Sequence, residues 1–284
     1  MKKILSVISA LLLPTLMLCG QNLRVSYAFL YKDNPSDKNF RTCMDMKLDY
    51  DGRESVFYSE GCFMRDSVSV YAFDDMGAIK NDEAYANLTR LPNGSHTDVY
   101  HIDYIKSAYD IYYRLIGHVY LGEGGPLEIP QWDLSSTEVK HFGGFEVKKA
   151  TAKYLDREWT VWYTEEVSVP AGPWLLWGCP GLIVYAIDSE SIFNFYILGQ
   201  EYIGESRWKA LRNNYTRGGH RILQYLSIKE EESIKCKLHR DMDFMNSVMG
   251  LIAGHTKDAN GNILEEPKYR DFVPLIPDEY WKKK

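Results

Sequence analysis

The sequence is short of positive charge, of cysteine and of long apolar runs, and each shortage excludes a class of protein. Its 284 residues carry 33 Lys and Arg against 39 Asp and Glu, so no surface for nucleic acid is expected at whole-chain level. After residue 20 no apolar run approaches the roughly 18 residues that cross a bilayer, so we expect no transmembrane span after signal removal. The 5 cysteines include no Cys-x-x-Cys pair, and we expect no metal and no cofactor.

The N-terminus has the pattern of a bacterial secretory signal peptide. Residues 1–3 form a positive region through Lys2 and Lys3, residues 4–18 are apolar but too short to span a membrane, and Cys19-Gly20-Gln21 offers a cleavage region. We therefore expect residues 1–20 to be removed and the protein to be exported, to the periplasm or in association with the outer membrane. Lipidation at Cys19 is the alternative, although the large Leu18 before it is unusual for a lipidated cysteine.

Export changes what the remaining cysteines can do, because an oxidising compartment permits disulfides. Cys43 and Cys62 flank the turn signal Asp51-Gly52, which would place them opposite each other in a hairpin. A disulfide between them would contribute about 3 kcal/mol. Cys179 and Cys236 would form the other pair, and four buried thiols are the alternative.

Alternating apolar and polar residues predict a β-rich domain over residues 21–203. The strand-like runs are residues 23–31, 40–48, 56–59, 67–73, 99–106, 109–121, 145–154, 158–164, 182–188 and 192–198. Long helical patterns are missing between them, which favours about eight to ten antiparallel strands in one large curved sheet, either an open barrel or a sandwich. The domain would be mainly β.

Residues 204–284 change period and predict a helical and irregular C-terminal segment that packs on the sheet, so that the whole is a β-rich α+β protein. Residues 206–213 predict a short helix capped by Ser206. Further on, a set of apolar residues falls at helical spacing on one face, namely Ile234, Leu238, Met242, Met245 and Met249.

A tryptophan-rich segment at residues 172–183, with the sequence GPWLLWGCPGLI, resembles the signature of the GLPGLI family of exported bacterial envelope proteins. Cys179 takes the place of the usual leucine. Residues 132–134, 142–150 and 156–164 also resemble the family, as does Phe57-Tyr58-Ser59, and the resemblance covers about residues 23 to 205. Val147 stands where the family often has a cysteine. The family has no established activity, so the resemblance implies a compartment and no mechanism.

The end of this segment has the chemistry of a turn that leads into a core strand. In Cys179-Pro180-Gly181-Leu182 proline fixes the first central φ, and glycine would supply the positive φ of a type II turn at the second. Gly178 adds conformational freedom before the turn. Leu182 and Ile183 then begin a continuous apolar strand.

The tryptophans near this turn also suggest a binding surface. Arg157, Trp174 and Trp177 could form a recognition surface that stacks on a sugar or a peptide, or that anchors a protein partner. A purely structural role in core packing or cation–π pairs is the alternative. Trp159 and Trp162 lie at opposite parities of one strand, which predicts one inward and one outward ring.

No catalytic motif stands out, so we nominate no catalytic residue. Cys236, His239 and Asp243 fall at helical spacing that could present metal ligands, although a solvated helix face is the commoner cause. Three functions remain open. The first is a non-enzymatic binding or accessory protein with an envelope or outer-membrane protein partner. The second is a carrier of an apolar ligand in the curved sheet, and the third is a hydrolase or metal-dependent enzyme.

Overall fold

The computed structural model describes residues 22–74, 78–92, 94, 96–115, 118–217, 223–227, 229, 233–234, 236–237, 240–241 and 274–276. The expected signal peptide lies outside these residues, and so do Leu238, Met242, Met245 and Met249 of the expected C-terminal helix face. The elements in chain order are β1 (Asn22–Tyr31), β2 (Arg41–Tyr50), β3 (Glu54–Ser59), α1 (Glu60–Ala72), α2 (Asp82–Arg90), β4 (Val99–Asp103), β5 (Ala108–Leu115), β6 (His118–Pro126), β7 (Val139–Phe142), β8 (Phe145–Tyr154), β9 (Arg157–Thr164), β10 (Leu182–Asp188), β11 (Phe193–Ile203), α3 (Trp208–Arg217) and β12 (Leu223–Ser227).

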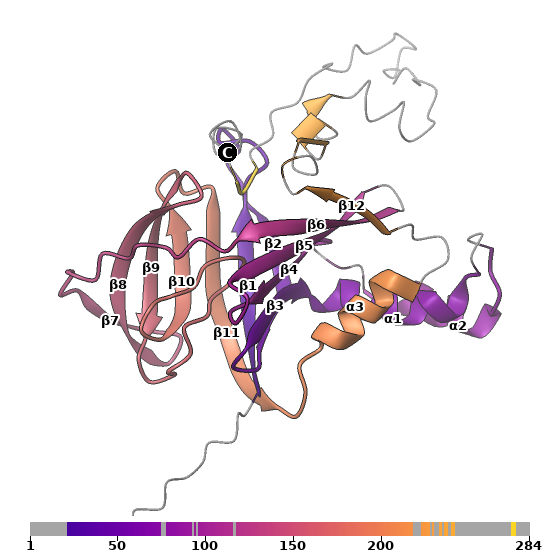
Figure 1. Ribbon diagram of the computed structural model, residues 1–284, viewed down its shortest axis with the longest axis horizontal. Helices are drawn as coiled ribbons and strands as arrows, with labels where there is room; N and C mark the ends of the chain where they lie inside the picture. The colour runs from indigo at the N-terminus through magenta and orange to yellow at the C-terminus, as the bar shows by residue number, and fades with distance from the viewer. Residues whose placement is uncertain are drawn as a thin grey trace, which may run out of the picture.

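The strands form one open, curved sheet of 12 strands in the order β12-β6-β5-β4-β3-β2-β1-β11-β10-β9-β8-β7. Strand β1 lies in the middle and joins an N-terminal half to a C-terminal half (Figure 1). Neighbours pair antiparallel, except that β12 runs parallel to β6. The prediction of a mainly β protein with a large curved antiparallel sheet is confirmed, and the sheet is not closed because β7 and β12 are both edges.

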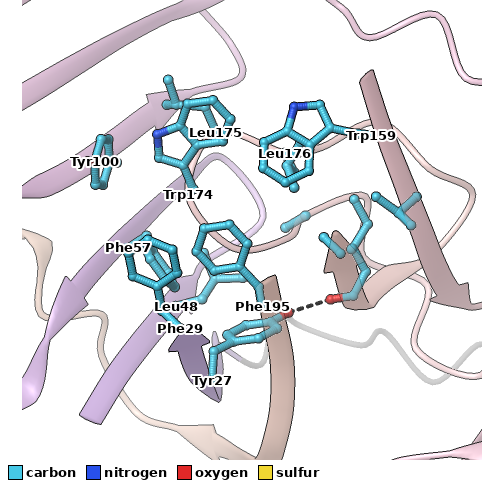
Figure 2. Close-up of a cluster of buried hydrophobic side chains, with 14 of the residues drawn as sticks. Tyr27, Phe29, Leu48, Phe57, Tyr100, Trp159, Trp174, Leu175, Leu176 and Phe195 are labelled. Carbon is cyan, nitrogen blue, oxygen red and sulfur yellow. Dashed lines mark hydrogen bonds between the residues drawn. The ribbon is translucent and has the colours of Figure 1, made fainter. Parts of the chain in front are cut away.

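The concave face holds the main core. In β1 the odd-numbered residues Leu23, Val25, Tyr27 and Phe29 face it, as the alternation of a strand requires. The loop between β9 and β10, residues 165–181, runs inside the curve and supplies buried side chains of its own, Trp174, Leu175 and Leu176. Figure 2 shows these residues beside Phe57, Tyr100 and Phe195. The concave volume is therefore occupied by a segment of the same chain.

The other face of the N-terminal half packs against helices. Val56, Tyr58, Val99 and Tyr112 form a second buried cluster with Leu211 of α3. On the same face Arg24 donates two hydrogen bonds to the fully buried carboxylate of Asp49, at 2.6 and 2.8 Å. The backbone N–H of Arg207, just before α3, donates to the same carboxylate at 2.8 Å. This charge-assisted contact fixes the start of α3 against β1 and β2.

Two local predictions are wrong for a shared reason. Residues 67–73 were expected as a strand but lie largely in α1, which begins after Ser59, whose hydroxyl accepts a hydrogen bond from the backbone N–H of Cys62. The predicted Cys43–Cys62 disulfide is absent, and both residues are buried thiols, as are Cys179 and Cys236. The β2–β3 ladder stops at Met46 and Ser59. Three more residues would have aligned the two cysteines, but the chain has already turned into the helix.

Candidate functional site

The loop of residues 165–181 is held by its own backbone and by its two flanking strands. The N–H of Gly178 donates to the carbonyl of Pro170 at 2.9 Å, and the N–H of Leu176 to that of Pro173 at 3.1 Å. At the start of β10 the N–H of Ile183 donates to Ala171 at 3.0 Å. These bonds fold the loop back on itself, so that one part lies inside the curve and another at its edge.

Trp174 lies in the inner part of the loop. Its side chain is 1% exposed, and its ring lies 5.6 Å from that of Trp159 and 6.5 Å from that of Tyr100, centroid to centroid. Its φ of 57° is in the left-handed region, which is rare for a bulky residue and costs about 1–2 kcal/mol. Among the residues that the structure describes, neither Trp174 Nε1 nor Trp159 Nε1 has a hydrogen-bond partner. The packing of the buried ring therefore offsets both the left-handed backbone and the unsatisfied indole N–H.

Trp177, three residues later, lies at the edge of the curve and is half-buried. Its Nε1 donates to the carbonyl of Glu128 at 3.1 Å, and its own carbonyl accepts a bond from Trp132 Nε1 at 2.7 Å. Its ring lies 5.4 Å from that of Tyr104, which in turn lies 5.9 Å from that of Tyr50. Trp177 is thus held in a fixed orientation by polar contacts on two sides.

We call this group of residues the aromatic rim. It consists of Tyr50, Tyr104, Trp132 and Trp177, all half-buried, together with the exposed Ile105 and Ile129. Ile105 follows Tyr104 in a turn and is 74% exposed, and Ile129 is 61% exposed beside Gly178. Burial raises the pKa of both Tyr50 and Tyr104, so their hydroxyls stay neutral. The rim therefore offers apolar and aromatic surface on a rigid base, with neutral hydroxyls at one side.

Arg157 lies elsewhere and is fully engaged. It is buried at the start of β9, where Nη1 donates to Asp188 Oδ2 at 2.9 Å and contacts Glu190 at 3.3 Å. Its Nη2 and Nε donate to the carbonyls of Pro274 and Leu275, at 2.8 and 3.2 Å. These bonds tie residues 274–276 to the sheet. The structure thus puts Arg157, Trp174 and Trp177 in three different environments, of which only that of Trp177 reaches the surface.

The turn after the loop differs from the prediction in where glycine is needed. The positive φ, 87°, is at Gly178, and Gly181 has none. Gly181 instead lies where a Cβ would come 1.9 Å from the carbonyl oxygen of Thr164, so that only glycine allows β10 to approach β9 there. Cys179 is buried, and burial raises the pKa of its thiol. That thiol stays protonated and is a poor nucleophile.

Sequence reasoning missed five of the six rim residues as parts of a surface, because they come from three separate segments. The signal that could have found them is an isoleucine, Ile105, inside a short polar turn. Trp159 and Trp162 lie on opposite faces of β9, as their parity predicts, but the outward ring is not open to solvent, since both residues are buried. Trp162 faces the other side of the strand, where Lys140 Nζ lies 4.2 Å from its ring centroid.

The other described residues offer few groups of side chains that could bind a metal ion. Among them no group of three or more His, Cys, Asp or Glu side chains is placed to hold a metal ion. Of the helically spaced residues Cys236, His239 and Asp243, only Cys236 is described, and it is buried. His101 is buried between Asp110, 3.3 Å from Nδ1, and Glu54, 3.5 Å from Nε2, with the ring of Trp208 stacked on it at 3.9 Å. No helix within the described ranges is long and apolar enough to cross a membrane.

Comparison with known proteins gives a fold and no activity. No protein-family model and no curated protein matches the sequence. Among solved structures, PNGF-II in one crystal form has a TM-score of 0.51 and 12% identity, over 78% of this chain and 34% of that chain. A second crystal form of PNGF-II scores 0.49, and an uncharacterized conserved protein from Thermus thermophilus scores 0.38 at 5% identity, over 72% of this chain and 91% of that one. This chain spans about a third of PNGF-II and is similar to that part in fold alone.

Proposed function

We propose that this protein is a non-enzymatic binding protein of the bacterial cell envelope, a member of the GLPGLI family, that holds a protein partner through the aromatic rim. One observation carries the proposal. Ile105 and Ile129 are 74% and 61% exposed. Ile105 follows Tyr104, whose ring lies against that of Trp177, and Ile129 follows Glu128, whose carbonyl accepts a hydrogen bond from Trp177 Nε1. The backbone carbonyl of Trp177 in turn accepts a hydrogen bond from Trp132 Nε1. An exposed apolar surface on a preorganised aromatic base is costly in water and is typical of a contact site.

The chemistry of the rim favours a protein as the ligand. Tryptophan and tyrosine are the residues that contribute most binding energy in protein interfaces, where they lie at the centre of an apolar contact. Since Trp177 and Tyr104 are already fixed, little side-chain entropy is lost when a partner covers them. The signal-like residues 1–20 and the GLPGLI-like segment support a location in the envelope, so the partner is expected there, for example an outer-membrane protein.

The test is crosslinking in intact cells of the native host, followed by affinity purification and mass spectrometry. The wild-type chain is expected to give one dominant envelope protein. The double variant Ile105→Asp/Ile129→Asp is expected to lose it, since two carboxylates would have to be buried in the contact. Tyr71→Asp on α1 is the matched control, because Tyr71 is 68% exposed and α1 packs on the face of the sheet opposite the core that the rim residues border. Equal capture by all three chains would refute the proposal.

A second candidate, a carrier of an apolar ligand, is favoured by the indole N–H groups of Trp159 and Trp174 in the concave core, which find no hydrogen-bond partner in the described part of the chain. A ligand carbonyl could accept from them. Because Leu175 and Leu176 already fill this core, binding would require the loop to move. Native mass spectrometry of the protein from its host should then show a bound small molecule that Trp174→Phe loses, since phenylalanine has no N–H. A measured mass equal to that of the polypeptide alone would contradict the carrier function and favour binding at the aromatic rim.

A further inference from the structure

Arg157, at the start of β9, holds two main-chain carbonyl groups from the C-terminal part of the chain. Its Nη2 and Nε donate to the consecutive carbonyls of Pro274 and Leu275, at 2.8 and 3.2 Å. A guanidinium group presents its donors in a fixed planar fork, so it can bind two carbonyls of one extended segment together. We call residues 274–276 the strap, because they lie against a strand that precedes them by more than a hundred positions in sequence.

The sheet orients Arg157 without help from the strap. Asp188 is buried, and its Oδ2 accepts a hydrogen bond from Arg157 Nη1 at 2.9 Å. Its Oδ1 accepts from the backbone N–H groups of Ile192 and Phe193, both at 2.8 Å. The ring of Phe193 lies against the guanidinium group, with its centroid 4.7 Å from the central carbon. The two donor groups that reach the strap are therefore preorganised by contacts within the sheet.

The strap meets this site with backbone acceptors and apolar side chains. Pro274 is buried and has no N–H group, so it leaves no backbone donor unpaired where water is excluded. Ile276 is 2% exposed and belongs to the main core cluster, against which Leu275 also packs. The site therefore suits an extended peptide in which a proline comes two residues before a buried aliphatic side chain.

Beyond these contacts the strap is not built into the sheet. Residues 274–276 belong to no helix or strand, and within the described ranges no backbone–backbone hydrogen bond joins them to another segment. Glu190 lies 3.3 Å from Arg157 Nη1, and its side chain is 64% exposed. When the strap leaves, this carboxylate is close enough to accept from the donors of Arg157 that the strap had used. Opening the site therefore leaves no guanidinium donor buried without an acceptor.

We propose that Arg157, Asp188 and Phe193 form an exchangeable peptide-binding site, which the strap occupies as an intramolecular ligand. The ligand that replaces the strap is an extended peptide of another protein with the same Pro-Leu-Ile chemistry. A tethered segment is present at a high effective concentration, so a free peptide binds weakly until the strap is displaced. The strap thus keeps the site closed. This site is separate from the aromatic rim and does not depend on the function proposed for the rim.

The test is binding of a fluorescein-labelled synthetic peptide of residues 272–278 to the full chain, measured by fluorescence anisotropy. The wild-type chain is expected to bind the peptide weakly. Ile276→Asp is expected to bind it about ten-fold more tightly or better, because a carboxylate is costly in the core and the strap leaves the site. Ile276→Ala weakens the packing of the strap without adding a charge, so it should act in the same direction if the aspartate variant does not fold.

The matched control is Arg157→Lys in each of the two Ile276 variants, because lysine keeps a positive charge beside Asp188 but lacks the planar fork. It should weaken peptide binding by about ten-fold. A peptide that itself carries Ile276→Asp should not bind any of the chains. Equal binding by the wild-type chain and both Ile276 variants, whether tight or absent, would overturn the proposal. So would tight binding that Arg157→Lys leaves unchanged.

Discussion

Trp174 and Trp177 belong to the same loop and lie three residues apart, yet their environments are opposite. Trp174 has a left-handed backbone and almost no exposure, and its indole N–H has no hydrogen-bond partner among the described residues. The indole N–H and the backbone carbonyl of Trp177 are both hydrogen-bonded, and its side chain is partly exposed to solvent. The inner half of the loop thus contributes to stability through packing alone, whereas polar contacts fix the outer half and leave surface free. One short segment both fills the core and builds the surface that we propose for binding.

The sharpest way to test this contrast is to remove the inner ring. Trp174→Ala should lower the free energy of unfolding by about 3–5 kcal/mol, because a fully buried tryptophan leaves a cavity against Trp159 and Tyr100. Denaturant unfolding measures it. Trp174→Gly should be no less stable than Trp174→Ala, since glycine adopts the positive φ without strain. A glycine variant clearly below the alanine variant would contradict the strained backbone.

The two glycines around Cys179 should respond differently to a methyl group. Gly181→Ala should cost about 3 kcal/mol, because the new Cβ would overlap the Thr164 carbonyl and push β10 from β9. In Gly178→Ala the new Cβ would make only ordinary van der Waals contacts, 3.8 Å or more from its neighbours, so the change should cost only the left-handed backbone penalty of about 1–2 kcal/mol. Thermal and denaturant unfolding of the pair decide the order. The reverse order would restore the type II turn expected from the sequence.

Substitution of Trp177 at the rim should affect binding of the partner more than the stability of the fold. Trp177→Ala should cost about 1–2 kcal/mol in stability, less than Trp174→Ala, because the ring is only partly buried and the rim rests on other contacts. Capture of the envelope partner should nevertheless fall by about ten-fold or more, as for an interface anchor. Stability from denaturant curves and capture from quantitative crosslinking are measured on the same preparations. A large loss of stability with unchanged capture of the partner would show that Trp177, like Trp174, has a structural role only.

The smallest expected effect is a loss of stability in alkali. Burial raises the pKa of Cys179 above its ordinary 9.0 and that of Tyr31 from 10.0 to about 12. Both groups stay protonated in the fold at pH values where the unfolded chain ionises. Their stabilising contribution is therefore complete below pH 9.0 and is lost as pH rises from 9.0 towards 12. Cys179→Ala should remove the part of the decline in Tm that starts near pH 9.0; an unchanged pH profile would contradict it.

Much of the fold follows from period alone, because nearly every strand has apolar residues at alternate positions and a turn at its end. The wrong predictions lie where a helix N-cap, and not the alternation of apolar residues, determines the secondary structure. Residues 67–73 have the composition of a strand, but Ser59 starts a helix that continues through them. The same helix removes Cys62 from the hairpin and with it the expected disulfide. The short strand β7 and helix α2 carry too few apolar residues to be seen by period, although Asn81 caps α2 with its side chain.

The candidate site was only partly predictable. Residue type nominated Arg157, Trp174 and Trp177 together, but which of them reaches solvent depends on how the loop enters the curved sheet. Arg157 is taken up by Asp188 and by two backbone carbonyls from residues 274–275, more than a hundred positions away in sequence. The other rim residues come from turns that approach one another only in three dimensions. No local sequence pattern predicts that these turns lie side by side.

The most direct test of the central claim is site-specific photocrosslinking in living cells of the native host. A photoreactive phenylalanine analogue would replace Ile129 at the rim and, in a parallel chain, Tyr71 on α1, two exposed positions. The account predicts one strong adduct with a single envelope protein from position 129 and none from position 71. No adduct from position 129, or the same adducts from both positions, would contradict the assignment of the rim as the binding surface.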